Sequence, residues 1–273
     1  MRRLAATATY VTATVAVIVM LFPLFWMMSL SFRADTEQFV IPPTLLPAEP
    51  VVGNYTRLLQ ETNFGWYVWN SLVIATATVV FTLTIACPGA YALTRFSFLA
   101  RPVFATGILF IYMFPPIFLG IPLFVIFSSL KLTNSFVGLV LAHTTFALPF
   151  LLWMLRDFFL AIPRELEEAA LVDGCSRPGA LWRVVLPLAR PGLIAAGIFA
   201  FILSWNDYVY ALILMTSESR KTITVGLSLF VESTTIEPGL MTAGGVLVTV
   251  PVLVLFMFVQ RYLVQGLAAG AIR

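Results

Sequence analysis

Long apolar stretches without a charged residue dominate this sequence and restrict what it can fold into. They run from Leu4 to Phe32, Thr62 to Thr94, Pro102 to Leu130, Leu132 to Leu155 and Pro238 to Gln260, and a further stretch, Pro191 to Ser217, holds only Asp207. A helix of about 20 apolar residues crosses the hydrocarbon core of a bilayer. Only 11% of the chain is charged, against about 25% in soluble domains. The pattern excludes a soluble enzyme, a disordered chain and a disulfide scaffold.

The stretches predict an all-α integral membrane protein, with residues 1–273 as a single transmembrane domain. We expect six transmembrane helices, at about 9–31, 67–94, 103–128, 136–158, 190–214 and 241–262. Membrane-spanning β-strands would instead alternate in segments of about 10 residues. Prolines inside the stretches, such as Pro115 and Pro116, predict kinks. Kinked helices suit a path that opens and closes, but they are also ordinary in membrane bundles.

The basic residues predict the orientation of the chain. If both termini are cytoplasmic, that side holds Arg2, Arg3, Arg95, Arg101, Arg156, Arg164, Arg177, Arg183, Arg190, Arg261 and Arg273, and the other side holds Arg33, Arg57, Lys131, Arg220 and Lys221. This orientation obeys the positive-inside rule and places the protein in the cytoplasmic membrane. The net charge of +3 follows from the topology and is no evidence for nucleic acid as a partner. The external segment from Ser217 to Gly239 is expected to be a polar loop.

The one sizeable cytoplasmic segment, between the fourth and fifth spans, predicts a short helix at about 164–173. Pro163 suits the first helical position, and Gly174 supplies a left-handed stop. The positive end of the helix dipole favours the acids of the first turn, Glu165, Glu167 and Glu168. Helices that lie on lipid headgroups favour Lys and Arg on the polar face. We therefore expect this acidic helix to dock on a protein, whose surface can approach closely over Ala169 and Ala170.

The segment at about 161–187 carries a spaced motif. Glu168-Ala169-Ala170 is followed after three residues by Gly174 and after nine more by Val184-Val185-Leu186-Pro187. This spacing resembles the EAA loop of binding-protein-dependent ABC importer permeases. The resemblance extends over nearly the whole chain, through Asn70-Ser71-Leu72, Gly89 to Phe96, Trp205-Asn206-Asp207 and the C-terminal run from Gln260 to Ala271. Together these motifs resemble the carbohydrate branch, and within it the second, six-span permease of maltose-type importers.

The resemblance implies a subunit that forms half of the translocation path for a sugar or a related polyol. A second permease, two ATP-binding subunits and an extracytoplasmic solute-binding protein would complete the complex. The ATPase-coupling residues carried over are Glu165, Leu166, Glu167, Glu168, Ala169, Ala170, Leu171, Val172, Asp173, Gly174, Leu186 and Pro187. The sequence lacks a Gly-x-x-x-x-Gly-Lys phosphate loop. We expect no catalytic residue, cofactor or metal on this chain, and ATP hydrolysis on a separate subunit.

Asp207 is the one formal charge in the interior of a predicted span, because the other charges within the predicted bounds lie at span ends. Placing a carboxylate at the bilayer centre costs roughly 2.5–3.5 kcal/mol, so intramembrane acids usually have a function. We assign Trp205, Asn206, Asp207 and Tyr208 to the translocation path. Contact between the carboxylate and a sugar is one interpretation, but a packing or gating role is favoured, because in the branch that the chain resembles the substrate site belongs mainly to the partner permease. His143, in the fourth span, is interpreted as a packing or hydrogen-bonding residue, and no Ser–His–Asp set can be argued from the sequence.

Two further classes of function are compatible with some of these features. A self-contained secondary transporter would use Asp207 as a proton relay and predicts internal repeats, but no repeat is visible in the sequence. A membrane-embedded enzyme would need several polar residues that converge within the spans. The permease of an ATP-driven importer is therefore the favoured hypothesis, and the sequence does not specify which sugar it carries.

Overall fold

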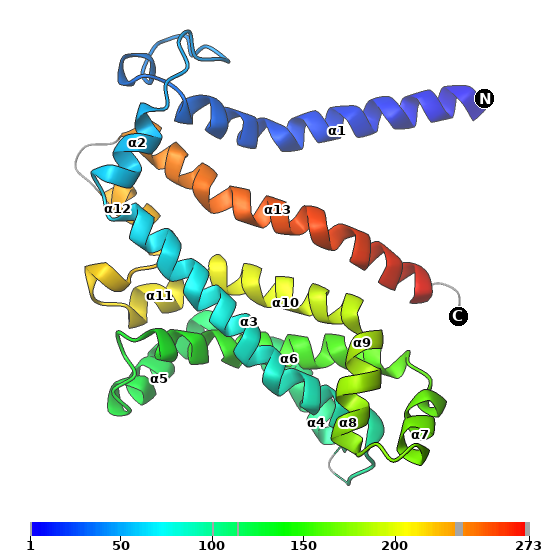
Figure 1. Cartoon of the computed structure of the whole chain (residues 1–273). Helices are drawn as coiled ribbons and strands as arrows, with labels where there is room; N and C mark the ends of the chain where they lie inside the picture. Colours follow the sequence, from blue (N-terminus) through cyan, green and yellow to red (C-terminus); the bar gives the residue numbers. More distant parts are fainter. Residues whose placement is uncertain (1, 100, 114, 233–236, 271–273) are drawn as a thin grey trace. The chain divides into compact units, whose positions relative to one another are not determined.

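The computed structural model describes residues 2–99, 101–113, 115–232 and 237–270. Within these ranges the chain is helical and forms no strand (Figure 1). It divides into two compact units, one made of Met1–Gly65 and Gly226–Val250 and the other of Trp66–Val225 and Pro251–Arg273. The second unit holds all the predicted coupling and path residues.

The first unit contains α1 (Arg2–Ser31), α2 (Gly53–Gln60), most of α12 (Ile223–Glu232) and the start of α13 (Pro238–Gly270). The amide of Asn54 in α2 donates to the carbonyl oxygens of Ser31 and Arg33 at 3.0 and 2.9 Å, which satisfies backbone groups at the C-terminal end of α1. Arg57 pairs with Glu237 at 2.7 Å between Nη2 and Oε2. The prediction of a polar loop from Ser217 to Gly239 is wrong, because its apolar residues from Ile223 onward form α12.

The second unit contains most of the remaining helices. They are α3 (Phe64–Arg95), α4 (Arg101–Met113), α5 (Pro116–Ser129), α6 (Phe136–Leu160), α7 (Arg164–Val172), α8 (Arg177–Ala180), a π-helical turn (Leu181–Val185), α9 (Leu186–Leu188), α10 (Arg190–Trp205) and α11 (Val209–Leu214). Ser135 is the N-cap of α6, where its side chain accepts a hydrogen bond from the backbone amide of Gly138. In chain order, α7 lies between α6 and α8, in the segment that connects the apolar helices α6 and α10.

Four helices in the described part of the chain are long and apolar enough to cross a membrane. They include Thr9–Ser31, Phe64–Arg95, Phe136–Leu160 and Pro238–Phe258, and a fifth candidate is the pair Arg177–Leu188 and Arg190–Trp205, bent by 83°. These four correspond to the first, second, fourth and sixth predicted spans. The prediction of six continuous transmembrane helices is therefore not confirmed.

The third and fifth predicted spans are each broken into two helices. In the third, Pro115 is extended (φ −62°, ψ 125°) and Pro116 begins α5. A residue that precedes proline is disfavoured in the α conformation, and proline has no amide to donate. In the fifth, α10 ends at Trp205 and α11 begins at Val209. Both segments are apolar, so their hydrophobicity predicts one continuous helix where the backbone forms two.

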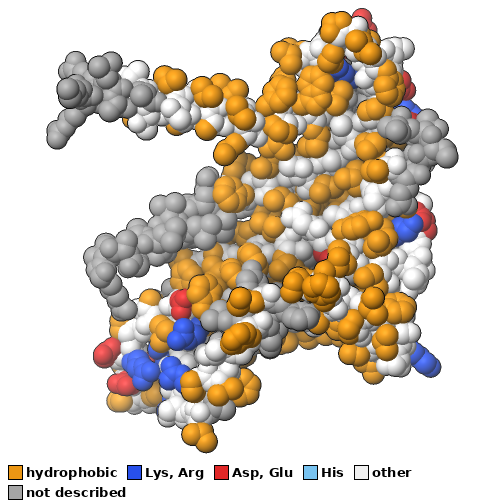
Figure 2. Space-filling view, turned by 180° about the vertical axis from the view of Figure 1, so that it is seen from behind, with side chains coloured by type: hydrophobic (Ala, Val, Ile, Leu, Met, Phe, Trp, Pro, Cys, Tyr) orange, Lys and Arg blue, Asp and Glu red, His pale blue; other side chains and the backbone are white. Residues whose placement is uncertain are grey.

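Exposed apolar side chains cover much of the surface of these helices. Figure 2 shows hydrophobic side chains across most of the visible face, with most of the visible Lys, Arg, Asp and Glu side chains near its margins. On α4 and α5 the exposed ones include Val103, Phe110, Phe118, Ile121 and Val125. Exposed apolar area of this extent is unusual in a soluble protein but is expected where lipid is the solvent.

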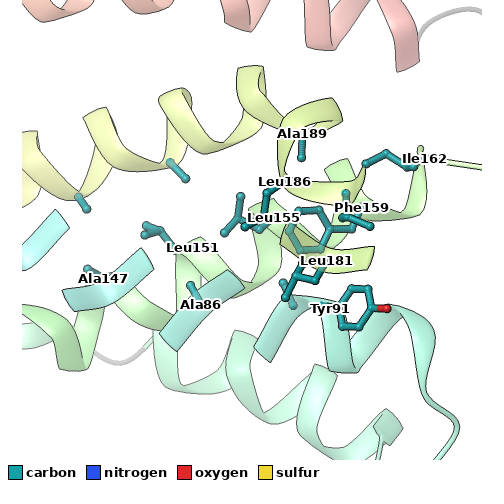
Figure 3. Packing of buried hydrophobic residues seen from close by; sticks show 14 residues of the cluster. Ala86, Tyr91, Ala147, Leu151, Leu155, Phe159, Ile162, Leu181, Leu186 and Ala189 are labelled. Atoms are coloured by element: carbon teal, nitrogen blue, oxygen red, sulfur yellow. The ribbon is translucent and has the colours of Figure 1, made fainter. Parts of the chain in front are cut away.

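The core of the second unit lies among α3, α6, α10 and the π-helical turn. Its alanines, Ala86, Ala90, Ala147, Ala196 and Ala200, have small side chains that let helices approach closely. At Gly192 of α10, an added Cβ would lie 2.4 Å from the ring of Phe158 in α6. The core continues through Leu155, Phe159 and Ile162 to Leu181 and Leu186 (Figure 3). A rigidly packed base therefore lies next to both ends of the segment that carries α7.

Candidate functional site

The short helix predicted at about 164–173 is confirmed as α7, Arg164–Val172. Pro163 precedes the helix as its N-cap with an extended backbone (φ −56°, ψ 135°), so it is not the first helical residue that was predicted. Glu165 and Glu167 lie in the first turn, where unpaired backbone amides and the helix dipole favour negative charge. The sequence signals for the start of this helix are therefore local and sufficient.

The predicted stop at Gly174 is also confirmed. Gly174 has φ +87°, in the left-handed region that glycine adopts without a steric penalty. The amide of Gly174 donates to the carbonyl of Leu171 at 3.1 Å, and that of Cys175 donates to the carbonyl of Ala170 at 2.9 Å. This pair of bonds is a Schellman motif, which satisfies the last carbonyl groups of the helix and reverses the chain.

Most side chains of α7 face outward and carry acids beside apolar groups. Those exposed are Glu165, Leu166, Glu168, Ala169 and Val172, followed by Asp173 and Gly174, while Ala170 and Leu171 are half-buried. Val172 is 87% exposed. A surface of this kind on a helix with two fixed ends is suited to contact with another protein. Figure 1 shows α7 at the end of α6, beside α8.

Glu167 differs from the other acids of α7 because it is buried. Its carboxylate pairs with Arg95 at the end of α3, at 2.5 Å between Oε2 and Nε, and the Tyr91 hydroxyl donates to Oε1. The Arg95 and Glu167 side chains are only 5% and 7% exposed. Sequence reasoning grouped Glu167 with the outward acids. Side chains three or four positions apart share one face of a helix, so Glu165, Glu167 and Glu168 cannot all lie on the same face.

Two arginines also form hydrogen bonds between the end of α3 and the segment at the start of α7, one in each direction. Arg95 Nη2 donates to the carbonyl of Ile162 at 3.1 Å, and Arg164 Nη2 donates to the carbonyl of Thr94 at 3.1 Å. The carbonyl of Thr94 belongs to the last turn of α3, where no intrahelical partner exists. The end of α3 and the start of α7 are thus joined in both directions.

The second half of the predicted EAA loop folds back onto the core. Ser176 caps α8 by accepting a hydrogen bond from the Gly179 amide at 3.2 Å. The guanidinium of Arg177 lies 5.1 Å from the centre of the Phe96 ring, a cation–π contact with the residue after α3. Of the two residues predicted here, Leu186 is buried in the core and Pro187 is exposed. Leu186 therefore anchors the loop, whereas Pro187 can reach a partner.

The predicted path residues lie at the break between α10 and α11, and they do not share one environment. Trp205 is buried and stacks on Phe201, with ring centres 5.6 Å apart. Asn206 is exposed, and Tyr208 is 36% exposed. The Asp207 carboxylate accepts hydrogen bonds from the amides of Tyr210 and Ala211 at 3.3 and 3.0 Å. Asp207 therefore holds the first turn of α11.

His143 of α6 is the partner of Asp207 that sequence reasoning missed. Its Nε2 lies 3.1 Å from Asp207 Oδ2, and its Nδ1 lies 2.7 Å from the Ser204 hydroxyl. The interpretation of His143 as a hydrogen-bonding residue is confirmed. No Ser–His–Asp set could be argued from the sequence, and the structure brings Ser204, His143 and Asp207 together because α6 places the imidazole between two residues at the end of α10. The sequence signal was the occurrence of His143 and Asp207 in the interior of predicted spans.

This cluster does not have the features of a hydrolytic site. The Ser204 side chain is buried, and the Asp207 oxygens are already occupied by two backbone amides and the imidazole. A nucleophilic serine needs an open position for the reacting carbon and donors for the oxyanion. Within the described residues, no group of three or more His, Cys, Asp or Glu side chains could hold a metal ion. The predicted motif residues from Gln260 onward cannot be placed, because the side chains of residues 260–270 and the whole of residues 271–273 lie outside the described part of the chain.

Comparisons with known proteins agree on the type of protein. The profile of the family described as "Binding-protein-dependent transport system inner membrane component" matches residues 85–269. The chain is 34% identical to the sulfoquinovosyl glycerol transport system permease protein of Agrobacterium fabrum, over 97% of this chain and 93% of the relative. It is 33% identical to the trehalose/maltose transport system permease protein of Thermococcus litoralis, over 96% and 94%.

A solved structure matches the fold over almost the full length. It is a chain from a bacterial ABC transporter involved in the import of the acidic polysaccharide alginate. The TM-score is 0.81 at 26% sequence identity, and the match covers 95% of this chain and 96% of that chain. The likeness therefore extends over nearly the whole chain.

Proposed function

Because this chain belongs to the family of binding-protein-dependent transport system inner membrane components, we propose that it forms half of the path through which an ATP-driven importer carries a sugar or a related polyol. It is a permease subunit and does not hydrolyse ATP itself. Its partners are a second permease, two ATP-binding subunits and an extracytoplasmic solute-binding protein. The observation that carries the proposal is α7, a short helix with both ends fixed and an outward surface of acids and apolar side chains.

In this proposal, α7 is the coupling helix that contacts the ATPase. Leu166 and Val172 supply apolar contact, and the exposed Glu165, Glu168 and Asp173 supply charge that selects a basic surface. Ala169 leaves room for the partner to approach the helix backbone. Leu171, Ala170 and Leu186 keep the loop on the core, while Gly174 ends the helix. Glu167 is the one coupling residue whose side chain points toward α3.

The proposal includes six crossings of the membrane within a single domain of residues 1–273. The third crossing would be made by α4 with α5, and the fifth by α10 with α11. Broken helices are tolerated at membrane depth where they are buried in protein or line a hydrated cavity. Both termini would be cytoplasmic, so that most of the Arg and Lys residues lie on that side.

The orientation has a direct test. A cysteine at Ile41, which is 92% exposed, is expected to react with a membrane-impermeant thiol reagent in intact cells. A cysteine at Val172 is expected to react only after the membrane is opened. Both variants carry Cys87→Ser and Cys175→Ser so that the chain has one thiol. Labelling of Val172→Cys in intact cells would contradict the proposed topology.

The identity of the solute is proposed at the level of its chemical class. The relatives are named for the transport of sulfoquinovosyl glycerol and of trehalose and maltose, and the similar structure for alginate. All are sugars or glycosides, which have many hydroxyl groups. Within the path we propose that Asn206 and Tyr208, whose side chains are accessible, contact solute, and that Trp205 and Asp207 hold the break in place.

A cross-linking experiment tests the coupling role. In the assembled complex, the Val172→Cys variant is expected to cross-link to the ATP-binding subunit through a bifunctional reagent that joins thiol to lysine. The Ile41→Cys variant is the matched control and should give no such product. Efficient uptake of solute by this chain alone in liposomes, without the ATP-binding subunits, would overturn the proposed function.

A further inference from the structure

Glu167 is a coupling residue that is held in a buried cluster by Arg95 and Tyr91, two residues with no role assigned so far. Its carboxylate accepts hydrogen bonds from the guanidinium of Arg95 and from the hydroxyl of Tyr91, and both donors come from the last two turns of α3. With both charged side chains less than 10% exposed, water cannot replace either partner readily. Removing one member of such a pair leaves an uncompensated buried charge, so the contact resists separation.

Two backbone contacts around this pair limit how it can move. Arg95 also holds the carbonyl of Ile162, and Arg164 holds the carbonyl of Thr94. These bonds act in opposite directions, from α3 to the segment before α7 and from the start of α7 back to α3. The four donors and acceptors cannot slide past one another as apolar side chains can, because each bond requires a defined geometry.

We propose that Arg95, Glu167 and Tyr91 clamp α7 to α3, so that a displacement of α7 by the ATPase reaches α3 directly. This inference rests on the proposed function of α7. Through the chain itself, α7 is connected only to α6 and to α8. The clamp adds α3, which is distant in sequence, to the helices that respond when α7 is displaced. Glu167 is then a positioning residue, and the ATPase contacts the exposed acids on either side of it.

The clamp differs from a more exposed ion pair that lies near the C-terminal end of α6. Arg156 Nη1 lies 3.2 Å from Asp157 Oδ1, with the two side chains 32% and 51% exposed. Exposed pairs of this type contribute little, because water and salt screen them. Arg156→Gln and Asp157→Asn therefore serve as matched controls that remove a charge from the neighbourhood and leave the clamp intact.

The first test uses the complete complex, with binding protein, second permease and ATP-binding subunits, in liposomes. Glu167→Gln and Arg95→Gln are expected to lower solute uptake about tenfold at an unchanged rate of ATP hydrolysis. The cross-link from Val172→Cys to the ATP-binding subunit should persist in both variants. Loss of that cross-link would overturn the clamp as a transmitter, since the pair would then serve only to keep α7 in place.

Charge reversal supplies the decisive comparison. Arg95→Glu/Glu167→Arg restores a pair of opposite charges with the order reversed, and we expect it to recover uptake above the level of either single variant. Wild-type uptake in Glu167→Gln, or a reversed pair that transports no better than Glu167→Gln, would overturn the clamp. Either result leaves the cross-link between α7 and the ATPase, and hence the proposed function, unaffected.

A covalent substitute guards against variants that fold poorly. Arg95→Cys/Glu167→Cys, in a chain with Cys87→Ser and Cys175→Ser, is expected to transport weakly until a short, reducible bifunctional thiol reagent joins the two positions. Uptake should then rise and should fall again on reduction. A joined chain that stays uncoupled while it still hydrolyses ATP would overturn the clamp, because a restored link between α3 and α7 would then not restore transport.

Discussion

Replacing Gly174 with leucine is expected to lower solute uptake by about 5- to 30-fold, the factor that corresponds to one or two kcal/mol. Gly174 has φ +87°, and an L-residue with a side chain is strained there by about 1–2 kcal/mol. Apart from the residue itself and its two neighbours in the chain, no heavy atom lies within 4 Å of a Cβ built at this position. The effect therefore comes from the backbone alone, as the Schellman motif opens and α7 loses its fixed end.

Asparagine provides the matched control for this substitution. Its short polar side chain is tolerated in the left-handed region, so Gly174→Asn should transport close to the wild-type rate. The measurement is uptake per ATP hydrolysed in the reconstituted complex, because a frayed α7 wastes hydrolysis. Wild-type coupling in Gly174→Leu would show that a rigid end of α7 is not needed.

Replacing Asp207 with alanine is the second change for which we expect a large effect, and the effect should be on stability. The first turn of α11 would lose its acceptor, at a cost of about 1 kcal/mol. The buried imidazole of His143 would be left without a partner at Nε2, at a cost of about 1–3 kcal/mol. Thermal unfolding of the purified complex in detergent should therefore begin at a lower temperature.

The same variant separates a structural role of Asp207 from contact with solute. The control is Asp157→Asn, which alters an exposed carboxylate near the C-terminal end of α6. It should leave the unfolding temperature unchanged. If Asp207→Ala instead unfolds at the wild-type temperature but binds solute more weakly in the assembled complex, the carboxylate contacts solute. The assignment of Asp207 to the scaffold would then be wrong.

The elements that could be predicted from sequence are those whose signals are local. Charge-free stretches identify α1, α3, α6 and α13, because length and apolarity alone decide whether a helix suits a bilayer. The ends of α7 were predictable from its acids and from Gly174, since caps are set within a few residues. Only the role of Pro163 was off by one position, as an N-cap instead of the first helical residue.

What could not be predicted depends on residues that are far apart in the chain. Glu167 meets Arg95 across 72 positions, and Asp207 meets His143 across 64. Hydrophobicity also missed the two breaks, because Pro115 and the segment between α10 and α11 lie in apolar surroundings. At Pro115 the reason is a missing amide, and at Asp207 it is a carboxylate that starts a new helix. Neither is measured by apolar content.

The exchange of hydrogen bonds between Arg95, Ile162, Arg164 and Thr94 has a consequence for protein engineering. A loop grafted from a related permease would bring its own residues at 162–167 but would meet the host's arginine at the end of α3. The donor loop and the host helix must therefore match as a set. Chimaeras designed to change the ATP-binding partner should exchange the last two turns of α3 together with the loop.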